Sequence, residues 1–76
     1  MGELSKAQIT TIEKIAVLLR NFTNDHYTDY HYTEIVGLLD QNNLSKHKKI
    51  LVSIYVDLKN KNKYEYAEKF AKKYNL

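Results

Sequence analysis

The chain has 76 residues, a formal net charge of +3, and no cysteine, proline or tryptophan. At this length it buries only about 60% of its unfolded surface, which excludes two separate domains and predicts one domain over residues 1–76. The absence of cysteine excludes disulfides and thiolate metal sites, so packing within the chain or against a partner must stabilise the fold.

The first predicted element is a helix over residues 6–22. Ser5 and Gln8 have the spacing of a capping box, in which each side chain binds the backbone N–H of the other residue. Leu4 and Ile9 flank this cap and are placed for a hydrophobic staple. Apolar residues recur every three or four positions and predict the buried face: Ile9, Ile12, Ile15, Ala16, Leu19 and Phe22.

A second helix is predicted over residues 32–41, after a polar and aromatic loop. Asn42 and Asn43 would end this helix, because asparagine tolerates the left-handed backbone conformation that closes helices. Gly37 costs about 1 kcal/mol of helix propensity relative to alanine, and close packing of another backbone is one reason for a glycine there. The residues expected to be buried are Ile35, Leu38 and Leu39.

The third segment fits two structures. A helix over residues 46–59, capped by Ser45, agrees with apolar residues at helical spacing. A strand over residues 49–58 agrees with the strict alternation of Ile50, Val52, Ile54, Val56 and Leu58, and would make the fold α+β. We favour the helix, since no other segment alternates well enough to pair with a strand. Such a helix is apolar nearly all round, so we expect it at the centre of the fold or at an interface.

The apolar pattern is interrupted at residues 60–62, and helical spacing resumes in a fourth predicted helix over residues 63–75. Acidic residues stand early in this last helix and lysines stand late, which matches the helix dipole. The predicted fold is therefore an all-α, single-domain bundle of three to four helices.

Charge divides the chain into two halves. Residues 1–42 carry three basic and six acidic side chains, a net charge of −3. Residues 43–76 carry nine lysines and three acidic side chains, a net charge of +6. The basic half is therefore suited to an anionic partner.

Catalytic and metal sites have little support in the sequence. There is no glycine-rich phosphate loop and no nucleophile motif, so we expect no enzyme activity and no cofactor. Potential metal ligands are grouped at Asp25, His26, Asp29 and His31. The two histidines are five residues apart and do not share a helical face, so we predict no metal site there.

Protein binding is the predicted function. Tyrosine is enriched at interfaces, and this chain has seven. Tyr27 and Tyr30 lie in the predicted loop, and Tyr32 lies at its junction with the second helix. Val52, Tyr55 and Val56 lie on the third helix, and we expect both groups at an interface. The protein would be a small cytoplasmic regulator or inhibitor that binds a larger host protein or nucleic-acid-processing machinery. Homodimerisation would also cover the third helix, and the lysine-, asparagine- and tyrosine-rich composition is typical of phage and mobile-element proteins.

DNA binding is the alternative. Two short helices joined at residues 41–44 are similar in arrangement to a helix-turn-helix. The residues that would contact nucleic acid are Ser45, Lys46, His47, Lys49, Ser53, Lys61 and Lys63. We expect no membrane binding, because no apolar stretch is long enough to span a bilayer and residues 1–6 have no signal-peptide pattern.

Overall fold

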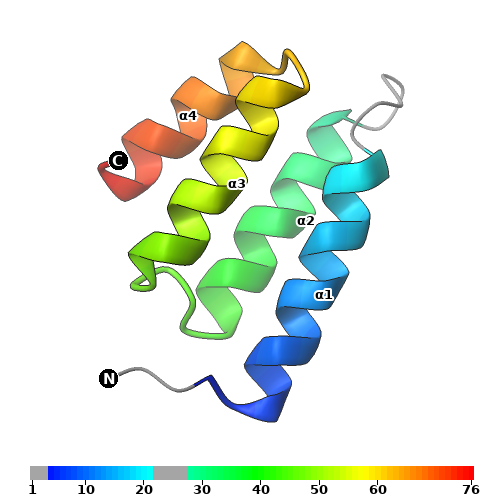
Figure 1. Ribbon diagram of the computed structural model, residues 1–76, viewed down its shortest axis with the longest axis vertical. Helices are drawn as coiled ribbons and strands as arrows, with labels where there is room; N and C mark the ends of the chain where they lie inside the picture. Colours follow the sequence, from blue (N-terminus) through cyan, green and yellow to red (C-terminus); the bar gives the residue numbers. More distant parts are fainter. Residues whose placement is uncertain (1–3, 22–27) are drawn as a thin grey trace. The chain divides into compact units, whose positions relative to one another are not determined.

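The computed structural model describes residues 4–21 and 28–76, and it is all-α over these residues (Figure 1). The four helices are α1 (Lys6–Arg20), α2 (Thr28–Gln41), α3 (Lys48–Asn60) and α4 (Tyr64–Tyr74). The predicted all-α class is confirmed. The alternative strand over residues 49–58 is wrong, because this segment is helical throughout.

The chain separates into two compact units, each containing a helical hairpin. The N-terminal unit, Met1–Leu44, contains α1 packed along α2, and the C-terminal unit, Ser45–Leu76, contains α3 packed along α4 (Figure 1). Buried apolar residues come from all four helices and from the turn after α2: Ile15, Leu19, Ile35, Leu39, Leu44, Leu51, Ile54, Leu58, Ala67 and Phe70. None of the helices described is both long enough and apolar enough to cross a bilayer.

Two helix starts differ from the prediction. Helix α2 begins at Thr28 and not at Tyr32, so Tyr30 is a helical residue and not a loop residue. Helix α3 begins at Lys48 after His47, which makes no side-chain capping bond. The predicted capping role of Ser45 is therefore wrong.

The predicted capping box at the start of α1 is confirmed. The Gln8 backbone N–H donates to Ser5 Oγ at 3.1 Å, and the Ser5 N–H donates to Gln8 Oε1 at 3.0 Å. The other amide atom of Gln8, Nε2, donates to the carbonyl oxygen of Asn42 at 2.9 Å. One side chain thus closes the start of α1 and links it to the end of α2.

The buried face of α1 differs in part from the predicted face. Ile15 and Leu19 are buried as expected, but Ile9 is 47% exposed and Ala16 is also exposed. Thr11 is buried instead, with its hydroxyl donating to the carbonyl oxygen of Ala7 at 2.8 Å, so burial leaves no unpaired hydroxyl. Phe22 lies outside the described residues, and the staple between Leu4 and Ile9 stays a prediction.

Asparagines in the left-handed conformation follow α2, α3 and α4. Their φ angles are 58° at Asn43, 62° at Asn62 and 57° at Asn75. In each case the next residue donates its N–H to a carbonyl oxygen five residues earlier, as in a Schellman motif. The three bonds are Leu44 to Leu39, Lys63 to Leu58 and Leu76 to Ala71, each 2.9 Å long. The predicted helix end at residues 42–43 is confirmed, and α3 ends at Asn60, one residue later than predicted.

Gly37 lies in the interior of α2, and its surroundings contradict the reason offered for it. Among the residues that the structure describes, a Cβ atom built at this position meets nothing within 4 Å beyond its own helix. Close packing of another backbone therefore does not explain this glycine.

Candidate binding surfaces

The first candidate surface is on α3, opposite its buried side. Leu51, Ile54 and Leu58 form the buried side of this helix. Val52 is 44% exposed and Val56 is 46% exposed, although both are large apolar residues. Together with two other exposed residues at helical spacing they form what we call the outer face of α3: Lys49, Val52, Ser53 and Val56.

Tyr55 lies at the edge of this surface and not at its centre. It is half-buried, and the Lys59 ammonium group lies 5.3 Å from the centroid of its ring. At this distance the cation is attracted to the ring face. Of the three α3 residues predicted at an interface, Val52 and Val56 share the outer face, and Tyr55 borders it beneath a lysine.

The predicted interface tyrosines of the N-terminal unit differ in exposure. Tyr30 is 62% exposed, whereas Tyr32 is half-buried. Burial raises the pKa of the Tyr32 hydroxyl above its usual value of 10.0, because desolvation disfavours the phenolate. Tyr27 lies outside the described residues. The predicted interface set is thus divided between two units, and of the two described tyrosines of the N-terminal unit, Tyr30 is the more exposed.

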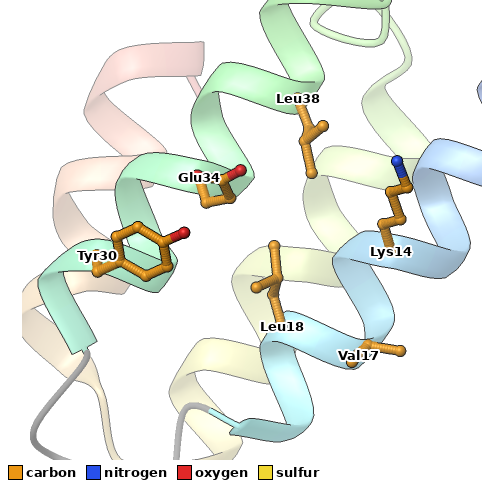
Figure 2. Close-up of a pocket in the computed structure, with 6 residues that line it drawn as sticks. All are labelled: Lys14, Val17, Leu18, Tyr30, Glu34 and Leu38. Carbon is orange, nitrogen blue, oxygen red and sulfur yellow. The ribbon is translucent and has the colours of Figure 1, made fainter.

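The second candidate surface is a groove between α1 and α2, within the N-terminal unit (Figure 2). Its volume is about 340 Å³. We call it the α1–α2 groove, and its lining residues are Lys14, Val17, Leu18, Tyr30, Glu34 and Leu38. Leu18 points from α1 toward α2, and Leu38 lies on the facing side (Figure 2).

Opposite charges stand on the two sides of this groove. Lys14 projects from α1 and Glu34 from α2, and both side chains are exposed (Figure 2). No ion pair joins them. The groove therefore combines an apolar floor with one free charge of each sign.

Sequence reasoning missed most of the α1–α2 groove. Only Tyr30 was predicted at an interface, and Leu38 was expected in the core. A signal was present in Val17, which lies outside the predicted buried face of the first helix and is 47% exposed in the structure. An apolar residue on the polar side of an amphipathic helix is a reason to look for a second contact surface.

The nucleic-acid residues of the alternative hypothesis all lie in the C-terminal unit. Lys46, Lys49 and Ser53 are exposed, and Ser45, His47, Lys61 and Lys63 are half-buried. The Lys61 ammonium group pairs with Asp57 Oδ2 at 3.1 Å, so part of its charge is compensated. The two helices needed for a helix-turn-helix, α2 and α3, belong to different units.

The residues considered as metal ligands are only partly described. Asp25 and His26 lie outside the described residues, Asp29 is exposed and His31 is buried. Over residues 4–21 and 28–76, no three histidine, aspartate or glutamate side chains are grouped to hold a metal ion.

Comparison with known proteins adds no relative. No family model, no curated protein and no solved structure matches this chain.

Proposed function

We propose that this protein is a non-catalytic binding module of the cytoplasm, a small regulator or inhibitor that docks the outer face of α3 on a larger protein. The observation that carries the proposal is the pair Val52 and Val56, one helical turn apart and both nearly half exposed. Covering the remaining surface of the two side chains would stabilise a complex by roughly 1 kcal/mol each.

Helix propensity supports the same conclusion. Valine is a weaker helix former than alanine, leucine or lysine, because its branched side chain loses rotamer freedom against the preceding turn. In a buried valine, packing compensates for this cost. Val52 and Val56 are exposed, so packing within their own chain compensates for little of it. Contact with a partner would provide the missing packing.

The charge around the outer face of α3 favours an acidic partner. Lys48, Lys49 and Lys59 are exposed on this helix, and the only acidic residue of α3, Asp57, pairs with Lys61. The C-terminal unit as a whole carries nine lysines and three acidic residues. An apolar patch with a basic border is complementary to an apolar patch bordered by carboxylates.

Nucleic acid is the second candidate partner, because Lys49 and Ser53 share the outer face of α3 with the valines. Lysine can neutralise phosphates, and serine can bind either phosphates or bases. The C-terminal unit contains no arginine, since the single arginine of the chain, Arg20, belongs to the N-terminal unit. This weighs against sequence-specific recognition of bases.

Two double variants separate these functions. V52S/V56S removes apolar surface and keeps every charge, whereas K46Q/K49Q removes two charges and keeps the valines. The control is I9S, which changes an apolar residue of similar exposure in the other unit. Immobilised proteins would be compared for capture from a nuclease-treated lysate and for binding of a mixed-sequence DNA duplex at 50 and 200 mM salt.

For the protein-binding function, we expect the wild type and I9S to retain the same protein and V52S/V56S to lose it. Capture that persists in V52S/V56S would contradict this function. The DNA-binding function predicts a different result: V52S/V56S still binds the duplex, and the salt dependence of binding falls by about two ions in K46Q/K49Q. Both results together would show that the protein is a DNA-binding module.

A further inference from the structure

We infer that the α1–α2 groove binds the same groove of a second copy of this chain, so that the protein forms a two-fold symmetric dimer through its N-terminal unit. The inference concerns a different surface from the outer face of α3 and does not depend on the proposed function.

The groove offers apolar surface for such a contact. Tyr30 is 62% exposed and Val17 is 47% exposed at its sides, and Leu18 and Leu38 line it between them. A groove of about 340 Å³ can receive side chains of this size from another molecule. Mutual insertion would cover the apolar residues of both copies at once.

Charge identifies a second copy as the occupant. A purely acidic partner would be repelled by Glu34, and a purely basic partner would be repelled by Lys14. In a two-fold contact the same patch meets itself, so a residue on one side of the groove faces the residue on the other side in the second copy. Lys14 of each copy would then pair with Glu34 of the other, giving two ion pairs that neither copy forms alone.

The charges also provide a reciprocal test. K14E leaves two glutamates in the groove, and E34K leaves two lysines. Each single variant would place like charges opposite each other twice in its own dimer, and we expect self-association to weaken about tenfold. Both positions are exposed helix positions, so circular dichroism should show unchanged helix content.

Two combinations should restore association. The double variant K14E/E34K exchanges the charges and can again pair with itself. An equimolar mixture of K14E and E34K should form a heterodimer, because every contact then joins opposite charges. The control V52S/V56S should self-associate as the wild type does, since it leaves the groove unchanged.

Sedimentation equilibrium at 0.05 M salt measures all six samples. We expect a dimer for the wild type, the control, the double variant and the mixture, and a larger monomer fraction for each single variant. A wild-type monomer at millimolar concentration would overturn the inference. Equal self-association of wild type, K14E and E34K would also overturn it, as would failure of both combinations to restore the dimer.

Discussion

Asn43, Asn62 and Asn75 occupy backbone positions where glycine is the usual residue. The left-handed conformation costs a residue with a Cβ atom about 1–2 kcal/mol of conformational energy. The cost is lower for asparagine, because its short side-chain amide can form a local hydrogen bond. The chain has only two glycines, and neither follows a helix. Asparagine therefore marks the ends of α2, α3 and α4, which is why the sequence located the end of α2 at residues 42–43.

This role predicts opposite effects for two substitutions of Asn62. Alanine keeps the Cβ atom and loses the amide, so N62A should lower the free energy of unfolding by about 1 kcal/mol. Glycine adopts this conformation without strain, so the free energy of unfolding of N62G should equal or exceed that of the wild type. The variant loses only the exposed hydrogen bond that Tyr64 Oη donates to Asn62 Oδ1 at 3.2 Å, which contributes little.

Urea unfolding followed by circular dichroism measures both variants of Asn62. N60A is the matched control, because Asn60 belongs to α3 and has a right-handed backbone. If N62A were as stable as N62G, the left-handed conformation would not be what selects asparagine here.

At the scale of the helix, α3 shows why two periods can fit one segment. Residues 50, 52, 54, 56 and 58 are all apolar, as on one side of a strand. In the structure Ile54 and Leu58 are buried while Val52 and Val56 are exposed, so the alternation does not correspond to one buried side. The alternation alone could not separate the two structures, because the exposed residues Val52 and Val56 complete the strand pattern together with the buried residues Ile54 and Leu58.

Helix α2 can be stabilised by substitution of Gly37. Alanine is better than glycine in a helix interior by about 1 kcal/mol. No described residue outside α2 lies within 4 Å of the position where its methyl group would lie. We expect G37A to raise the free energy of unfolding by up to about 1 kcal/mol. Thermal unfolding of G37A beside T33A, an exposed position in the same helix, would measure this gain. A lower melting temperature for G37A would mean that another segment packs against this glycine after all.

For the whole molecule, the boundary in charge and the boundary in structure coincide. The charge changes sign between residues 42 and 43, and the boundary between the two units along the chain lies between Leu44 and Ser45. No charged residue lies between these two points, so the N-terminal unit has a net charge of −3 and the C-terminal unit +6. The charge halves read from the sequence thus coincide with a structural division that the sequence analysis did not predict.

The candidate surfaces were predictable to different degrees. Val52 and Val56 could be found from sequence, because they lie opposite the apolar residues of their own helix. The α1–α2 groove could not, because it is formed by two helices whose relative register depends on packing. Its charged members, Lys14 and Glu34, also resemble ordinary surface residues when each helix is considered alone.

The single-domain prediction can be tested through cooperativity. The N-terminal unit contains 44 residues and the C-terminal unit 32. Chains below about 40 residues rarely fold alone without metals or disulfides, so the C-terminal unit should depend on the rest of the chain for its stability. We therefore expect both units to unfold in one transition. The variant I35V, at a buried position of α2, should lower stability by about 0.5–1.5 kcal/mol.

Amide signals followed by NMR during urea unfolding report each unit separately. If the chain is one cooperative domain, I35V should shift the midpoints of α1 and α3 signals by the same amount. A shift confined to the N-terminal unit would show two independently stable parts.

The left-handed asparagines have a consequence for chemical synthesis of the protein. The conformation that L-residues avoid at positions 43, 62 and 75 is the preferred helical conformation of D-residues, which are their mirror images. D-Alanine fits these three backbone positions without the steric conflict that L-alanine meets. The ends of α2, α3 and α4 can therefore be specified by the chirality of a single atom each, independently of any side-chain amide.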